Sequence, residues 1–273
     1  MRNSGKLLCS LFAVFLAVIF TSSGIDGKGK MTGYQIMKKQ KDTHKAKTEY
    51  EEQEMILIDK KGNKTKREVK SWVKEVGKDI HKGMLVFLSP SDIKGTTLLT
   101  WQNKARDDDQ WLYEPARPGK MQRVSSGSKH NYFMGTDYTY EDLQTEELED
   151  FNYTLLKDVT LDDQACYVIE ARPKTATKKK EAGYAKRKLW INKEHLYTIK
   201  VEFYDKNTKK LIKTQFGRKF EKVTGKKWRP MENVIVNHKL NHKTFVNIEK
   251  RVLDKSMDDS MFTDRYILKG SHM

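Results

Sequence analysis

Alternating apolar and polar residues in the last third of the chain most strongly limit its fold. Within His195–Asp205, one face of an extended segment would carry Tyr197, Ile199, Val201 and Phe203. This period of two, with polar residues between, is typical of an antiparallel sheet with one face exposed to solvent. Further strand candidates follow after short polar turns, at Leu211–Phe216, Trp228–Leu240 and Thr244–Leu253. Four consecutive strands joined in this way predict an up-and-down arrangement.

Strand candidates also fill much of the remaining chain. They lie at Lys45–Asp59, Arg67–Val76, Met84–Leu88, Tyr153–Leu156, Ala165–Ala171 and Lys188–Asn192, with two more within Phe87–Leu143. About ten strands in one meander exceed what an open twisted sheet usually carries without curling. We therefore predict a mainly β fold, a half-open antiparallel β-barrel of about ten or eleven strands.

Three short stretches could supply helices to cover the concave face of such a barrel. Thr32–Asp42 is amphipathic, with Thr32 as a plausible N-cap, and the other two are Ser89–Ile93 and Thr139–Glu149. The inner face of the barrel must be filled by side chains, by these helices or by a ligand. The polar, then aromatic segment Ser256–Tyr266 is predicted to pack back on the sheet.

The two ends of the chain carry segments outside this fold. Residues 1–24 combine basic residues, an apolar run from Leu7 to Phe20 and small residues, which is typical of a cleavable signal peptide. A membrane-spanning helix needs about 20 apolar residues, more than this run provides. We expect cleavage after Ser23 or Gly24, export to the periplasm, a single domain over residues 25–268, and a cloning scar or disordered tail over residues 269–273.

The chain is unusually rich in charge, with 33% charged residues and a formal net charge of +16. Such a basic excess indicates nucleic acid or another anionic partner, and export argues against nucleic acid. Anionic lipid, lipopolysaccharide and an acidic protein stay open, beside a surface whose lysines serve solubility only. A basic rim that could meet an anionic membrane is predicted at Arg172, Lys174, Lys178, Lys179, Lys180, Lys186 and Arg187.

Residues that suggest chemistry have simpler structural interpretations. Asp107, Asp108 and Asp109 are expected in a hairpin turn, because adjacent strand residues point to opposite faces and no EF-hand pattern accompanies them. The Ser125–His130 segment lacks a Gly-x-Ser-x-Gly motif and is predicted to be a mobile loop near the barrel mouth.

The histidines and the cysteines give no stronger signal. His238 and His242 are expected to flank an exposed turn, without a neighbouring acidic or cysteine ligand. Cys166, the one cysteine beyond the leader, is expected to be buried and inert. We predict no enzyme activity, no metal and no cofactor.

Three blocks of sequence resemble one known family. Ser91–Trp101, Asp107–Tyr113 and Phe133–Leu143 resemble the LolA-like outer-membrane lipoprotein-sorting proteins, in the branch found beside exporters of the resistance-nodulation-division type. The resemblance covers about residues 33–268. It implies an incomplete antiparallel barrel lidded by helices, located in the periplasm, with an apolar concave cavity that takes up acyl chains.

Apolar residues in several predicted strands are candidates for that cavity. They are Met84, Val86, Leu88, Leu99, Trp101, Trp111, Tyr113, Phe133, Met134, Tyr197, Ile199, Val201 and Phe203. Ligand cavities are mostly apolar with a few placed polar groups, although each of these residues could instead fill a core. The predicted function is a monomeric carrier that binds the acyl chains of a lipid or lipoprotein and exchanges them with a membrane partner. The alternative is a periplasmic sensor or adaptor of the RseB kind, which binds a protein and carries no lipid.

Overall fold

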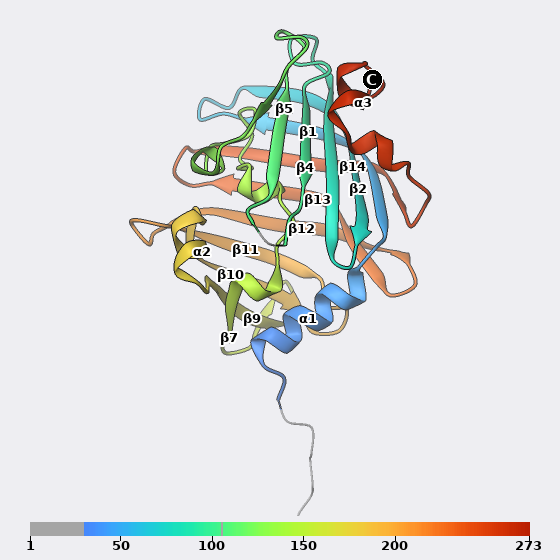
Figure 1. The fold of residues 1–273 in the computed structure, drawn as a ribbon. Helices are drawn as coiled ribbons and strands as arrows, with labels where there is room; N and C mark the ends of the chain where they lie inside the picture. The colour runs from blue at the N-terminus through green and yellow to red at the C-terminus, as the bar shows by residue number, and fades with distance from the viewer. Residues whose placement is uncertain (1–29, 105) are drawn as a thin grey trace, which may run out of the picture. The chain divides into compact units, whose positions relative to one another are not determined.

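The computed structural model describes residues 30–104 and 106–273, and Met31–Met273 form one compact unit (Figure 1). The predicted signal peptide lies outside the described residues. The strands are β1 (Thr48–Ile58), β2 (Lys64–Gly77), β3 (Ile80–Ser89), β4 (Thr97–Trp101), β5 (Asp109–Tyr113), β6 (Met121–Arg123), β7 (Phe151–Leu155), β8 (Val159–Leu161), β9 (Gln164–Pro173), β10 (Tyr184–Asn192), β11 (Thr198–Asp205), β12 (Leu211–Thr224), β13 (Lys227–Asn237) and β14 (His242–Leu253). The α-helices are α1 (Gly33–His44), α2 (Ala176–Glu181) and α3 (Asp264–Leu268), and the 3-10 helices are η1 (Ser126–Ser128), η2 (Glu141–Leu143), η3 (Leu148–Asp150) and η4 (Asp259–Phe262).

All strands belong to one antiparallel sheet, which confirms the predicted mainly β, half-open class. The sheet has 14 strands, more than the predicted ten or eleven, because strands as short as β6 and β8 carry no readable period. The order is β6-β5-β4-β3-β2-β1-β14-β13-β12-β11-β10-β9-β7, with β8 beside β9. The predicted single meander is therefore wrong. Two meanders meet where β1 pairs with β14, and β6 and β7 end the path without pairing with each other among the described strands.

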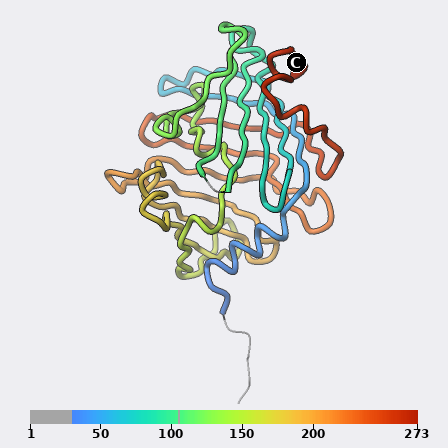
Figure 2. The backbone as a smooth tube through the Cα atoms, viewed as in Figure 1, coloured from blue at the N-terminus to red at the C-terminus, as the bar shows by residue number. Residues whose placement is uncertain are grey.

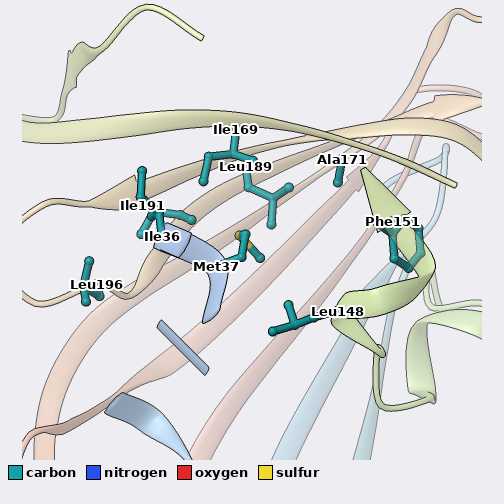
Figure 3. Close-up of a cluster of buried hydrophobic side chains, with 9 residues drawn as sticks. All are labelled: Ile36, Met37, Leu148, Phe151, Ile169, Ala171, Leu189, Ile191 and Leu196. Carbon is teal, nitrogen blue, oxygen red and sulfur yellow. The ribbon is translucent and has the colours of Figure 1, made fainter. Parts of the chain in front are cut away.

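Helix α1 begins where the sequence predicts. The Thr32 side chain accepts a hydrogen bond from the Gln35 amide while the Gln35 side chain accepts one from the Thr32 amide, a complete capping box. Gly33 lies so close to β7 that a Cβ would stand 2.8 Å from the Tyr153 carbonyl oxygen. This approach lets Ile36 and Met37 pack against β7, β9 and β10 in a buried cluster (Figure 3).

One face of the sheet, here called the inner face, carries the candidate site. Directly opposed residues of antiparallel strands share a face. The pairing of the strands places Leu98, Leu85, Met55 and Val246 on the inner face. Its other half lies under α1. Residues 124–150, here called the crossover, link β6 to β7 (Figure 2). The crossover packs on this face through Phe133, which stacks on Phe87 at 5.6 Å between ring centroids.

Two of the three predicted helices differ from the structure. Ser89–Ile93 forms a turn, and Thr139–Glu149 forms only parts of η2 and η3. In the second case, Asp142 accepts hydrogen bonds from the Thr139 amide at 2.7 Å and hydroxyl at 2.9 Å. Local side-chain bonds of this kind compete with a continuous helix.

The opposite, outer face is covered at β2–β5 by the C-terminal segment of residues 256–273, here called the strap (red in Figure 1). Phe262 and Ile267 of the strap are fully buried against Met84, Val86 and Leu99, which confirms that this segment packs back on the sheet. Of the last five residues, His272 is buried and meets the Tyr113 ring edge-on, whereas the other four are exposed. Within the described residues, no helix combines the length and apolar character that crossing a membrane requires.

Candidate functional site

Two cavities lie on the inner face, on either side of η2. Leu143 borders a cavity of about 270 Å³ and the adjacent Asp142 borders one of about 420 Å³. The crossover is therefore the wall between them. Their linings differ sharply in chemistry.

The smaller cavity is largely apolar. Its walls come from β1–β4, β13 and β14, and Tyr138 and Leu143 of the crossover border it as well. The apolar lining consists mainly of Met55, Leu85, Leu98, Leu143, Val246 and Ile248. Polar groups line it too, including Glu51, whose carboxylate accepts a hydrogen bond from Arg251 at 2.6 Å. Burial raises the pKa of Glu51, aided by the charge of Glu49 and opposed by Arg251. Apolar walls with few polar groups are typical of small-molecule sites.

The larger cavity is strongly charged. Eight acidic and four basic side chains line it, from the Asn103–Asp108 loop, the crossover, α2 and β10. Several are paired, such as Lys178 with Asp150 at 3.0 Å and Arg187 with Glu146. An acyl chain here would strip water from these groups without replacing their hydrogen bonds. The smaller cavity is therefore the better candidate for an apolar ligand.

A buried polar cluster holds the crossover on the inner face. The side chain of Asp137 is 1% exposed and accepts hydrogen bonds from Asn237 at 3.0 Å and Thr244 at 2.8 Å, with His242 at 2.7 Å. The expectation that His242 is an exposed loop residue is wrong, because His242 begins β14 and its side chain, in contact with this carboxylate, is 18% exposed. The turn expected between His238 and His242 is confirmed.

An ion pair continues this cluster. Lys213 of β12 is 1% exposed and pairs with Asp142, which also accepts a hydrogen bond from the Tyr184 hydroxyl at 3.0 Å. Burial and the charge of Asp142 raise the pKa of Tyr184 well above its ordinary value. Together, Asp137 and Asp142 fix the crossover segment that carries Tyr138 and Leu143 over the smaller cavity.

The residues predicted to bind ligand fall into several groups. Seven pack in the cluster under the strap, namely Met84, Val86, Leu88, Leu99, Trp101, Trp111 and Tyr113. Of all thirteen, only Met84 also borders the smaller cavity. Phe133 and Met134 pack between crossover and sheet, while Val201 and Phe203 line the larger cavity. Tyr197 stacks on Phe220 at 3.8 Å and Ile199 is buried. The structure therefore does not bring the set into one cavity.

The predicted basic rim is likewise divided. Lys178 and Arg187 line the larger cavity, whereas Arg172 and Lys186 bind Glu170 at 2.6 and 2.8 Å. Lys174, Lys179 and Lys180 are exposed in and before α2.

The acidic run and the serine loop meet through ion pairs. The predicted hairpin turn precedes β5, and Lys129 donates to Asp107 at 2.6 Å. Burial alone would raise the pKa of Asp107, yet the bonds from Lys129 and Ser126 hold it below its ordinary value. Asp109 binds Arg106 and Arg123. Cys166 is fully buried, as predicted.

Asp108 should make folding stability depend on pH. It lines the larger cavity, and burial raises its pKa to about 6 although the Asn103 amide donates to it. The folded state then favours the protonated acid, so charging it costs stability as pH rises from about 4 to about 6. We expect Asp108→Asn to stabilise the protein by about 1 kcal/mol at neutral pH, allowing for partial exposure, and to have little effect below about pH 4. Urea unfolding at both pH values checks this, and an equal change at both would contradict it.

Apart from Met84, the residues that line the smaller cavity were not among the predicted ligand residues. Val246 and Ile248 lie in a strand whose alternation was legible, so pattern alone could have suggested them. Leu143 and Met55 gave no such signal, because their approach depends on the crossover and on the pairing of β1 with β14.

Comparisons with known proteins agree with this fold. A family model described as an uncharacterized protein family matches residues 79–269. A solved domain from Vibrio parahaemolyticus, described as an outer-membrane lipoprotein-sorting protein domain, is 30% identical with a TM-score of 0.81, covering 86% of this chain and 98% of its own. A DUF1329 family protein from Desulfovibrio piger is 27% identical, with a TM-score of 0.81 and coverage of 86% and 97%. A LolA superfamily protein from Nitrosomonas europaea shares the fold at 18% identity, with a TM-score of 0.69 and coverage of 87% and 100%. A comparison with the curated proteins finds no match.

Proposed function

Because this chain belongs to the LolA-like family of outer-membrane lipoprotein-sorting proteins, we propose that it is a periplasmic carrier for the acyl chain of a lipid or lipoprotein. The observation that carries this proposal is the apolar cavity of about 270 Å³ on the inner face. This volume lies just below the lower limit of small-molecule sites, about 300 Å³, which limits the proposed cargo to a single chain.

Capture would rest on burial of the chain in this cavity. Each buried methylene contributes about 0.8 kcal/mol, so a single chain gives useful but reversible binding. The polar groups of Glu51, Ser71 and Asn233 would face the polar part of the cargo. Exchange with a membrane partner completes the proposal, and an exporter of the resistance-nodulation-division type is the partner that the family resemblance predicts.

Filling the cavity tests the proposal. Gly83 borders it, and a Cβ there would meet only the Trp72 carbonyl at 3.7 Å and Val73 at 4.0 Å, which are ordinary contacts. We expect Gly83→Leu to fold, to occupy the space of about three methylenes and to weaken binding of a dansylated fatty acid by about 50-fold. The measurement is a fluorescence titration of delipidated protein.

A matched change elsewhere separates the cavity from the chemistry of the substitution. Gly127 lies in exposed η1 and has nothing within 4 Å of its Cβ position, so Gly127→Leu should bind the probe normally. Delipidated wild-type protein that takes up no probe would overturn the carrier proposal. Equally weakened probe binding in both variants would show that the smaller cavity is not the binding site.

A further inference from the structure

The turns that connect the strands lie along two opposite sides of the sheet, here called its edges. Lysines gather at one of these edges. The β11–β12 and β13–β14 turns abut there, since the His238 amide donates to the Ile212 carbonyl at 2.8 Å. Helix α2, between β9 and β10, joins them through a hydrogen bond from the Lys206 ammonium to the Lys180 carbonyl (left side of Figure 1). We call this the lysine edge: Lys179, Lys180, Lys206, Lys209, Lys210 and Lys239.

Two leucines stand among these lysines. Leu211 is 38% exposed and Leu240 is 46% exposed, and both immediately follow an exposed lysine. The Asp205 carboxylate at the same turn is occupied by the amides of Asn207 at 2.9 Å and Thr208 at 2.7 Å. The lysine edge thus combines a strong positive charge with exposed apolar side chains.

At the opposite edge, several lysines are paired with acidic side chains. There, Lys193 pairs with Asp158 at 2.6 Å and Lys227 pairs with Asp254 at 2.5 Å. Lys78 lies beside Asp79 in the β2–β3 turn. Acids thus neutralise part of the lysine charge at the opposite edge, whereas the six lysines of the lysine edge form no ion pair with a carboxylate among the described residues.

We propose that the lysine edge docks the protein on the surface of an anionic lipid bilayer. Clustered lysines are attracted to anionic headgroups, while leucines between them can enter the interface. Helix α2 also lines the larger cavity through Thr177 and Lys178, so docking places that cavity next to the membrane. This inference concerns the membrane surface and does not depend on which cargo is carried.

Vesicle co-sedimentation tests the docking. The chain from residue 25 onward is mixed with vesicles of phosphatidylglycerol and phosphatidylcholine in equal parts, or with phosphatidylcholine alone. We expect binding to the anionic vesicles only, and weakening by added salt. Because one lysine near an anionic surface changes the partition coefficient about fivefold, the triple variant K206Q/K209Q/K210Q should bind about 100-fold less.

A variant with the same net charge provides the control. K78Q/K222Q/K226Q removes three exposed lysines at the opposite edge, two in turns and Lys222 near the end of β12, and should bind anionic vesicles much more strongly than the first variant. Leu240→Ser should weaken binding without changing its salt dependence. Equal losses in the two triple variants would overturn the proposal, as would absence of binding to anionic vesicles. Both triple variants should still take up the dansylated fatty acid, which keeps this test separate from that of the carrier function.

Discussion

Replacing Lys213 by methionine is expected to lower the free energy of unfolding by about 3 kcal/mol. Methionine keeps an apolar stem close to the Phe203 ring, over which the Lys213 ammonium now lies at 4.6 Å from the ring centroid. The loss comes from Asp142, which keeps bonds from Thr139 and Tyr184 but becomes a buried charge without a counter-ion. Urea unfolding of the variant measures this loss.

Two further variants determine whether the ion pair is the cause. Adding Asp142→Asn to Lys213→Met removes the uncompensated charge, so the double variant should regain at least about 1 kcal/mol. Lys186→Met removes a lysine that pairs with Glu170 on the outer face, where its side chain is 20% exposed, and should cost less than about 1 kcal/mol. Equal losses for Lys213→Met and Lys186→Met would show that the crossover is held by packing alone.

The Lys213–Asp142 ion pair is an example of a contact that a single sequence does not predict. Lys213 follows two apolar residues at the start of β12. No residue near it in the sequence indicates that it pairs with Asp142, 71 residues earlier in the chain. The same holds for Asp137, whose partners Asn237 and Thr244 come from two later strands. Polar clusters of this kind depend on the strand order, which propensity and period do not encode.

The strands themselves were predictable because each carries its own signal. The alternation around Ile199–Phe203 and the N-cap at Thr32 are local, and both occur where expected. The pairing of β1 with β14 joins the first and the last strand of the described chain and has no local signal. The prediction of one meander failed at this pairing.

The sequence could not show which face of a strand borders the cavity, for a different reason. Met84–Leu88 is apolar at every position, so period two cannot say which side of β3 faces a cavity. The structure covers both sides, Phe87 by the crossover and Met84 and Val86 by the strap. A continuous apolar strand indicates two covered faces, and deciding between them requires knowing what covers each.

Replacing Phe262 by alanine should release the strap from the outer face. Phe262 is fully buried, and its carbonyl accepts a hydrogen bond from the Trp101 indole at 2.9 Å. Truncating a buried phenylalanine costs about 3–5 kcal/mol, and the strap can open without unfolding the sheet because it pairs with no strand in the described topology. We expect faster amide exchange in the strap and red-shifted tryptophan emission as Trp101 and Trp111 become hydrated.

The same variant distinguishes a filled core from a ligand site on the outer face. If the aromatic residues under the strap only form a core, Phe262→Ala should leave uptake of the dansylated fatty acid unchanged, because the inner-face cavity is intact. Leu268→Ala, at a residue of α3 that is 40% exposed, should change neither exchange nor uptake. A loss of uptake in Phe262→Ala without faster exchange of the strap would instead place the acyl chain among Trp101, Trp111 and Tyr113. The cargo would then lie beneath the strap, and the apolar cavity beneath the crossover would be a packing defect.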